Sequence, residues 1–549
     1  LSTKQNAQEL LDAAKTVGVN ATSEVRDDGT YMIVNIPDVW TQGVSEYFNT
    51  LTKKSAAIRF FTTDKEDNEL RPATKQTPEW LVCDLRDNEG QYAESFQYVI
   101  TPDKNGDVLL TLKGVNEPMA ISQIMLIPHD TLPTYDSYIN KYKNAPLGES
   151  TIKIEAEYPS QLSTNTVYPT EDRASAATSP ADTSRTVLNT IGGEKWGTAG
   201  QSISYRFRVD KTGLYSIDMR FRQNVLDGLF VSRSLSLYSD GLSEGADGYY
   251  NGYPFSEAVQ CRFNYSGYWQ STSMNNGTRD EAGNLVNYQF YFVEGVTYTL
   301  KLEVSLGTMA PVLDKIQASL NSINDDYLTI MRLTGSSPDA YRDYHFSRVM
   351  PTTLADMAAQ AKILEQTAEE LKAIAGSSSS SVGTIIKIAK LLEKMSDEDE
   401  IARNMKTLKS YIGSLGTLLT DAKNQPLQLD YIVIQAPGSK LPTAEPNFLR
   451  KIVHEVSAFV RSFLRDYNSM GAMEDASEDA LTVWVAYGRD QSQVIRNLIT
   501  NDFTYNTGIP VDLKLVSGGT LLPSILAGMG PDVYLGLGQG DVINYALRG

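Results

Sequence analysis

The chain has 549 residues, enough for three or four domains of average size, and its composition is close to the norm for soluble globular proteins. It carries 49 Lys and Arg against 67 Asp and Glu, a net charge of -18. This balance argues against nucleic acid or an anionic lipid surface as the main partner, because both favour basic patches. Two cysteines, Cys83 and Cys261, are too few for a disulfide framework or a zinc cluster. No apolar run approaches the roughly 18 residues of a membrane-spanning helix.

The first part of the chain, from Thr30 to about Leu320, has the pattern of many short strands, preceded by a helix-like stretch at residues 4–15. Residues 203–209 and 214–221 both alternate between apolar and polar side chains, and the turn between them predicts an antiparallel hairpin with one buried face. Many short strands without intervening helices predict β-sandwiches or barrels.

This strand-rich region looks duplicated, because a similar series of features occurs twice at nearly equal spacing. The first series is Trp80, strands at residues 96–100 and 109–112, Met119 and the tyrosines Tyr135 and Tyr138. The second is Trp269, strands at residues 288–292 and 299–302, Met309 and Tyr327. We therefore expect two β-sandwich domains, at residues 1–148 and 149–337.

From about Pro351 the apolar residues recur at intervals of three and four, which predicts amphipathic helices at residues 354–371, 385–395, 400–419 and 448–467. A Ser-rich break at residues 377–381 interrupts them, and a strand-like piece at residues 429–434 precedes the last one. We expect a small helical bundle at residues 338–475, with a spacing or packing role.

Beyond Ala480 the pattern becomes α/β. Strands are predicted at residues 481–486, 511–516 and 532–535, and helices at residues 491–500 and 521–527. Strand–helix alternation predicts a parallel sheet with crossovers. Because such a sheet needs both faces covered, residues 476–549 are expected to be the start of a larger domain.

Signatures of catalysis are poor. The three histidines, His129, His345 and His454, lie in separate segments. Residues 376–384 lack the lysine of a phosphate-binding loop, and residues 536–540 lack the spacing of a dinucleotide fingerprint. The acidic run at residues 397–400 is typical of a helix start. We therefore expect a protein that is not an enzyme.

Aromatic side chains crowd a Gly- and Asn-rich stretch between strands. Sugar rings present C–H faces that stack on aromatic rings, so loop aromatics on a rigid scaffold favour glycan contact. The alternative is that these residues belong to the sheets and the core, where tyrosine is common. The candidates for glycan contact are Tyr249, Tyr250, Tyr253, Tyr268 and Trp269.

The segment Thr151-Ile-Lys-Ile-Glu155-Ala-Glu157-Tyr158, followed by residues 174–178, 191–193, Trp196, 213–215 and 254–257, resembles the galactose-binding-like jelly-roll modules related to carbohydrate-binding modules. The resemblance implies that Glu155 and Glu157 supply ligands to a structural calcium ion, since carboxylate oxygens suit calcium. The alternative is an ordinary strand whose glutamates face solvent.

The last segment resembles the start of an extracellular sugar-type solute-binding protein of an ABC importer. The motifs are residues 481–485, Gly488-Arg-Asp490, Asp502-Phe-Thr504, Thr507-Gly-Ile-Pro-Val511 and Ala527-Gly-Met-Gly-Pro-Asp-Val533. The order of modules resembles that of the large binding proteins of Gram-positive bacteria, which implies a lipoprotein held at the cell surface.

In that family the ligand lies between two lobes, at loops that follow the strands. The resemblance implies ligand contacts from three loops, although aromatic residues often found after the third strand are replaced by residues 536–540. The implied ligand-binding residues are Tyr487, Arg489, Asp490, Ser517, Gly518, Thr520, Gly538, Gln539 and Asp541.

The sequence thus favours a non-enzymatic solute-binding protein that captures a carbohydrate for an ABC importer permease by hinge closure. Because the sequence starts at Leu1 without a leader and ends at Gly549 within the first lobe, we expect a cut chain that binds its ligand weakly or not at all. One alternative is a surface glycan-binding or adhesion protein that uses the jelly-rolls. A second is the accessory-module region of a glycoside hydrolase, although no segment singles out its pair of carboxylates.

Overall fold

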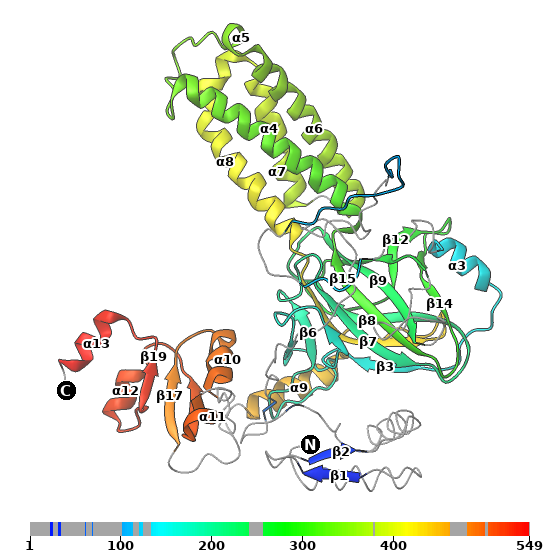
Figure 1. Ribbon diagram of the computed structural model, residues 1–549. Helices are drawn as coiled ribbons and strands as arrows, with labels where there is room; N and C mark the ends of the chain where they lie inside the picture. Colours follow the sequence, from blue (N-terminus) through cyan, green and yellow to red (C-terminus); the bar gives the residue numbers. More distant parts are fainter. Residues whose placement is uncertain are drawn as a thin grey trace. The chain divides into compact units, whose positions relative to one another are not determined.

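The computed structural model describes residues 22–25, 31–34, 61, 68–69, 101–113, 120–124, 133–240, 256–376, 379–461, 480–499 and 503–547. The chain divides into two compact units (Figure 1). The larger unit comprises residues 77–169 and 190–445, and the smaller unit comprises residues 1–76, 170–189 and 446–549. Among the helices in the described ranges, none combines the length and the apolar content that crossing a bilayer requires.

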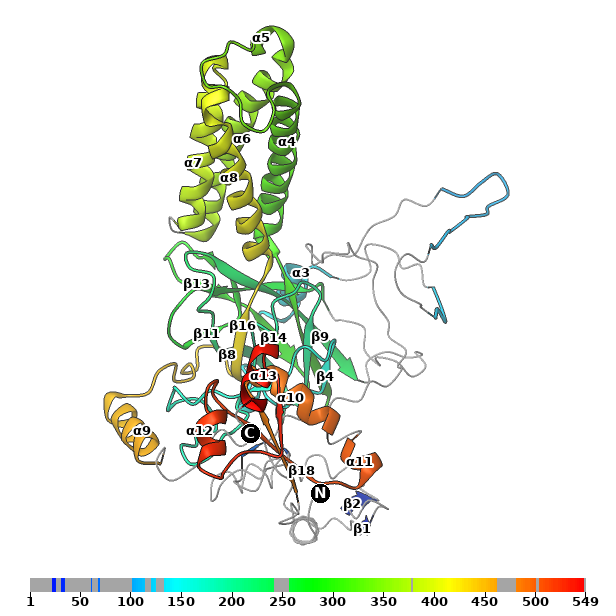
Figure 2. The ribbon, with the colours of Figure 1, turned by 90° about the vertical axis from the view of Figure 1, so that its left-hand side faces the viewer.

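Two mainly antiparallel sheets enclose the core of the larger unit (Figures 1 and 2). The first sheet has the order β10 (Val259–Asn264), β9 (Phe230–Asp240), β15 (Thr297–Ser305), β7 (Ser202–Arg208), β4 (Gln161–Leu162). The second has the order β11 (Gln270–Ser273), β8 (Gly213–Arg222), β16 (Leu427–Gln435), β6 (Thr190–Gly193), β5 (Pro169–Thr170). Strand β14 (Gln289–Phe292) also pairs with β8, and β3 (Ile152–Glu155) with β16.

Apolar side chains at alternate positions of both sheets meet in one core, as expected of a β-sandwich. The core residues of the first sheet include Ile203, Tyr205, Leu300 and Leu302, and those of the second include Ile217, Met219 and Ile432. The structure therefore contains the two facing sheets of the β-sandwich that is predicted after residue 149.

The predicted hairpin of residues 203–221 is wrong. Strand β7 pairs with β15 and β4, whereas β8 pairs with β16, β14 and β11 in the opposite sheet. Both strands alternate because each turns one face to the same core. Alternation does not reveal which strand is the neighbour, and residues 209–212 carry the chain from one sheet to the other.

A four-helix bundle is inserted between β15 and β16 (Figures 1 and 2). The predicted helices at residues 354–371, 385–395 and 400–419 are confirmed. The helices are α4 (Ala310–Thr334), α6 (Pro351–Ala375), α7 (Ser380–Met395) and α8 (Glu398–Lys423), with the short α5 (Phe346–Val349) between α4 and α6.

Helix α4 corrects the predicted organisation. The pattern predicts strands to about residue 320 and a domain boundary at residue 337, but the helix already begins at Ala310. Its buried side chains recur at intervals of three and four, including Val312, Ile316, Ser319, Ile323 and Ile330. They pack on the other helices, so the bundle starts within the predicted second sandwich.

Strand β16 also corrects the predicted domain organisation, because residues 429–434 do not belong to the helical region. The strand pairs with β8 along one edge and with β6 and β3 along the other. The strand is buried throughout most of its length, as expected of a central strand. The sandwich is therefore completed by chain that follows the bundle.

Buried polar contacts fix the base of the bundle to the sandwich. Arg262 of β10 donates to the carbonyl oxygens of Ile374 (2.6 Å) and Ala375 (3.0 Å) at the end of α6. Arg233 of β9 donates at 2.8 Å to the carbonyl oxygen of Gln425, just after α8. The Gln425 side chain in turn accepts from the backbone N–H of Ser232 at 2.9 Å. The Arg262 contacts satisfy carbonyl groups that the end of α6 leaves without intrahelical partners.

Helix α3 (Tyr135–Tyr142) covers the exposed edge of β14. The Tyr135 hydroxyl accepts from the backbone N–H of Gln289 at 2.8 Å and donates to its carbonyl at 3.2 Å. Tyr138 makes the same pair of contacts with Tyr291, at 2.8 Å and 3.4 Å. The tyrosines predicted to end a first sandwich therefore protect an edge strand of the second one.

Most of the predicted first sandwich, including Lys4, Cys83 and residues 96–100, lies outside the described residues. Residues 109–112 are described and are not a strand, and Leu109 is 94% exposed. The structure gives β1 (Thr22–Val25) and β2 (Tyr31–Val34), which form an antiparallel pair. The predicted duplication thus finds no support at residues 109–112.

The smaller unit contains a parallel sheet of order β18 (Val511–Leu515), β17 (Leu481–Val485), β19 (Val533–Leu535). Val483, Val485 and Leu513 form its small core. All three predicted strands and their parallel pairing are confirmed. Its helices are α10 (Arg489–Leu498), α11 (Thr504–Thr507), α12 (Leu521–Leu526) and α13 (Gln539–Ala546), and α9 (Phe448–Arg461) precedes the sheet in the chain.

Candidate ligand site

Three loops of the smaller unit meet at one edge of the parallel sheet. Residues 486–488 follow β17, residues 516–520 follow β18, and residues 536–538 follow β19. Because the strands are parallel, their carboxyl ends lie at the same edge, where open α/β sheets bind ligands. All nine residues predicted to bind ligand lie in these loops or in the first turn of the helices that follow them.

The first and third loops are in contact through Tyr487 and Gly536. Gly536 has a φ of +86°, a conformation that favours glycine, and a Cβ atom placed there would come within 2.5 Å of the Tyr487 ring. The ring therefore lies against the Gly536 backbone, while the side chain remains 41% exposed. An aromatic residue from the first loop thus occupies the place beside the third strand, where the sequence has glycines.

The other two loops at this edge carry polar groups. The Thr520 hydroxyl donates to the Ser517 carbonyl at 2.8 Å, which fixes the turn after β18. Asp541 lies in the first turn of α13, and its Oδ2 atom would be 3.3 Å from a Cβ atom at Gly538. Gln539 begins the same helix, and Gly518 leaves open space at its Cα. Hydroxyl, carboxylate and amide groups beside an aromatic ring can together bind a hydroxyl-rich, partly apolar ligand.

Arg489 and Asp490 occupy the first two positions of α10, but their side chains lie outside what the structure describes. The turn before them is fixed by Gln491, whose Oε1 atom accepts from the Gly488 N–H at 3.2 Å. Ser492 adds a second contact, since its hydroxyl donates to the Gly488 carbonyl at 3.1 Å. The first loop is therefore held in place by its own helix.

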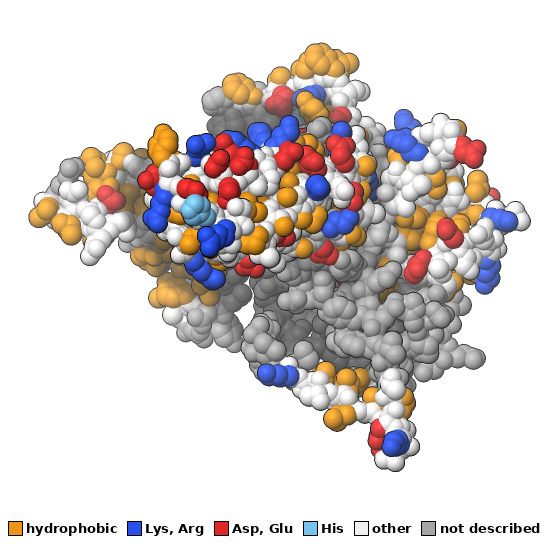
Figure 3. All heavy atoms as spheres, turned by 90° about the horizontal axis from the view of Figure 1, so that it is seen from above, with side chains coloured by type: hydrophobic (Ala, Val, Ile, Leu, Met, Phe, Trp, Pro, Cys, Tyr) orange, Lys and Arg blue, Asp and Glu red, His pale blue; other side chains and the backbone are white. Residues whose placement is uncertain are grey.

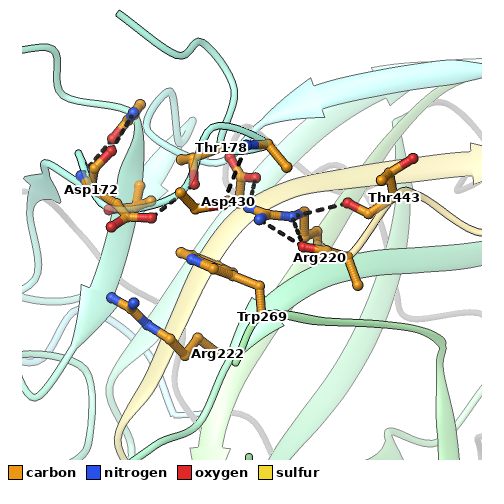
Figure 4. A network of polar contacts seen from close by, with 12 residues as sticks. Asp172, Thr178, Arg220, Arg222, Trp269, Asp430 and Thr443 are labelled. Atoms are coloured by element: carbon orange, nitrogen blue, oxygen red, sulfur yellow. Dashed lines mark hydrogen bonds and ion pairs between the residues drawn. The ribbon is translucent and has the colours of Figure 1, made fainter. Parts of the chain in front are cut away.

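The five residues predicted to contact glycan have different outcomes. Tyr249, Tyr250 and Tyr253 lie outside the described residues. Trp269 is only 3% exposed, because its indole lies between the guanidinium groups of Arg220 and Arg222, at 4.3 Å and 4.9 Å from the ring centre (Figure 4). This burial corrects the prediction that Trp269 stacks on a sugar. Tyr268 is 70% exposed and remains a candidate.

Around Trp269 lies a fully buried ion pair between Arg220 and Asp430, which joins β8 to β16 (Figure 4). Arg220 also donates to the carbonyl oxygens of Thr443 (3.2 Å) and Ala444 (2.8 Å) in the chain beyond β16. The sequence pattern around Trp269 does not reveal its two arginine neighbours, because Arg220 and Arg222 lie on β8, much earlier in the chain. This network holds β16 and its exit in place.

The predicted calcium ligands do not form a carboxylate cluster. The Oε1 atom of Glu155 is 2.7 Å from Nζ of Lys153, on the same strand. Glu157 is 1% exposed, and burial, together with the charge of Glu157, raises the pKa of Tyr205. Throughout the described ranges, three or more His, Cys, Asp or Glu side chains nowhere gather in a way that could hold a metal ion. The structural calcium ion implied at Glu155 and Glu157 therefore stays a prediction.

Comparison with known proteins concerns chiefly the bundle. A family model described as the four-helix-bundle domain of bacterial solute-binding proteins matches residues 311–424, which span α4 to α8. The bundle is thus similar to the helical bundle of bacterial solute-binding proteins. No curated protein matches the chain.

Several solved structures match part of the chain at low sequence identity. A cycloisomaltooligosaccharide glucanotransferase from a Paenibacillus species is 14% identical, with a TM-score of 0.18, over 32% of this chain and 22% of that one. A family 35 carbohydrate-binding module from Cellvibrio japonicus is 9% identical, with a TM-score of 0.18, over 28% and 82%. One from Clostridium thermocellum is 11% identical, with a TM-score of 0.15, over 29% and 84%. The chain thus spans about a fifth of the first of these proteins.

Proposed function

We propose that this protein is a solute-binding protein that captures a carbohydrate at the carboxyl edge of the β18–β17–β19 sheet. The observation that carries the proposal is the meeting of three loops at that edge, with Tyr487 lying against Gly536. Independent support for the class comes from the bundle, which matches the model for bacterial solute-binding proteins.

The chemistry of the edge favours a carbohydrate over other solutes. A partly exposed aromatic ring suits the C–H face of a sugar, and carboxylate, amide and hydroxyl groups at the same edge suit its hydroxyls. A dominant polyanionic ligand is disfavoured by the net charge of -18. Acidic and basic side chains are also interspersed over the described surface seen from above (Figure 3).

The proposal extends to the setting of the protein. It would act without catalysis, at the outer face of a cell membrane through a lipid anchor, and deliver its ligand to the permease of an ABC importer. In such a system a second lobe closes over the ligand, and the contacts of the β18–β17–β19 edge supply one side of the site.

Replacing Tyr487 with Ala should abolish carbohydrate binding at this edge, because the ring supplies the stacking surface. Saturation-transfer difference NMR with short oligosaccharides detects even weak binding, and we expect transfer to the sugar C–H protons for the wild-type chain only. Tyr341→Ala is the matched control, since Tyr341 is 93% exposed and lies in the larger unit. Equal transfer in the wild-type and Tyr487→Ala proteins would refute a role for Tyr487.

A second candidate function is surface glycan binding by the β-sandwich, favoured by two exposed tyrosines on the loop between β10 and β11. Tyr265 is 38% exposed and Tyr268 is 70% exposed. The loop is shaped by Ser266, whose hydroxyl accepts from the Tyr268 N–H at 3.1 Å. If this loop binds the glycan, Tyr268→Ala rather than Tyr487→Ala will remove the transfer signal, and the two functions are thereby separated.

A further inference from the structure

The interior of the four-helix bundle contains a polar cluster between α4 and α6, which pack on one another. Ser322 and Asp326 are four residues apart on α4, and Thr353, Asp356 and Gln360 are three and four apart on α6. Such spacings place the members of each set on one face of its helix. Asp326, Thr353 and Gln360 are 8%, 6% and 9% exposed.

The contacts within this cluster leave two oxygen atoms without a hydrogen bond. Asp356 accepts from the Ser322 hydroxyl and, at 3.2 Å, from Nε2 of Gln360. Asp356 and Thr353 lie close enough to Asp326 for both to shift the pKa of its carboxyl group. The buried atoms Asp326 Oδ2 and Gln360 Oε1 have no partner. The Gln360 amide is held on Asp356 through its nitrogen, so its unpartnered oxygen belongs to a group that is anchored in the cluster.

Two neighbouring carboxylates repel one another, and either a shared proton or a bound cation relieves that repulsion. Burial and the neighbouring Asp356 carboxylate raise the pKa of Asp326 to about 7. The ion pairs found among the described residues include neither aspartate, so no lysine or arginine supplies that charge. Removing this uncompensated charge would stabilise the bundle, whether by protonation or by a bound cation.

We propose that a hard divalent cation of the calcium class binds between α4 and α6, held by Asp326, Asp356 and Gln360 with the Thr353 hydroxyl. All of these groups offer oxygen atoms, the donors that calcium prefers, and the ion's flexible coordination allows water to complete the set. The ion would use both unpartnered oxygens and join two helices, and so stabilise the bundle.

The test is thermal unfolding of the whole chain after chelator treatment, with and without 1 mM CaCl2 as a reagent. We expect CaCl2 to raise the Tm of the wild type by about 5 °C or more. Asp326→Asn should raise the Tm of the calcium-free protein, because it removes one like charge, and should abolish the response to CaCl2. A purely structural role of Asp326 would not combine a higher Tm of the calcium-free variant with the loss of its response to CaCl2.

Two further variants keep the test interpretable. Gln360→Leu should reduce the calcium response by removing a neutral ligand, and Glu365→Gln is the control because Glu365 is an exposed carboxylate on the same helix. A wild-type Tm that is unchanged by CaCl2 and by MgCl2 would overturn the proposal. It would mean that Asp326 and Asp356 share only a proton. An equal response in wild type and Asp326→Asn would also overturn it.

Discussion

Residues 149–337 expressed alone will not fold into a β-sandwich, whereas residues 133–445 will. The shorter segment lacks β16, which pairs with β8, β6 and β3 and fills the centre of the second sheet. Without it, two broken edges and the apolar faces of Ile217 and Met219 are open to water. Near-ultraviolet circular dichroism and thermal melting measure this, and we expect a cooperative transition for the longer segment only.

A point substitution tests the same claim within the whole chain. Ile432 is fully buried in β16, so Ile432→Asp places a charge in the core and should abolish cooperative folding of the sandwich. Leu441→Asp is the matched control, because Leu441 is 41% exposed. A stable, cooperatively melting fragment of residues 149–337, or an Ile432→Asp protein as stable as the control, would contradict the central position of β16.

Arg220→Met should destabilise the protein by about 3–5 kcal/mol, because it leaves Asp430 buried without its partner. The variant also removes the donors to the carbonyl oxygens of Thr443 and Ala444. Replacing both partners, as Arg220→Met with Asp430→Leu, should recover much of the loss, since an apolar pair is often as stable as a buried ion pair. Urea unfolding of the three proteins gives the comparison.

Arg222→Met provides the control for this series. Arg222 contacts the other face of Trp269 and donates to Gln428 at 2.6 Å, but it is not fully buried. We expect a cost of about 1 kcal/mol or less. Equal losses for Arg220→Met and Arg222→Met would mean that the buried ion pair contributes nothing beyond the contact with the indole.

Local sequence patterns were sufficient to predict the strands of the smaller unit and their parallel pairing. Each predicted strand of residues 481–535 is a short segment followed by a helix, and strand–helix alternation leaves little choice other than parallel pairing. The convergence of the ligand loops follows from that pairing. The contact between Tyr487 and Gly536 does not, because it depends on a backbone angle that the sequence only hints at through the glycine.

Patterns failed in the larger unit where the decisive contacts are distant in the sequence. Residues 427–435 form an evident strand, yet its neighbours lie before the bundle, and no local feature identifies them. Helix α4 was hidden because its first residues, Ala310 to Ile316, also fit the supposed repeat of a sandwich. Trp269 has the composition of a glycan-binding loop around it, and only the fold shows the two guanidinium groups that cover it.

Hydrogen–deuterium exchange of the whole chain, with and without a saturating oligosaccharide, tests the proposed capture of carbohydrate most directly. The proposal predicts slower exchange in peptides covering residues 486–490, 516–520 and 536–541, with Tyr487→Ala removing the effect. Protection confined to residues 265–269, or no protection in any of the three loops with any oligosaccharide tried, would contradict it.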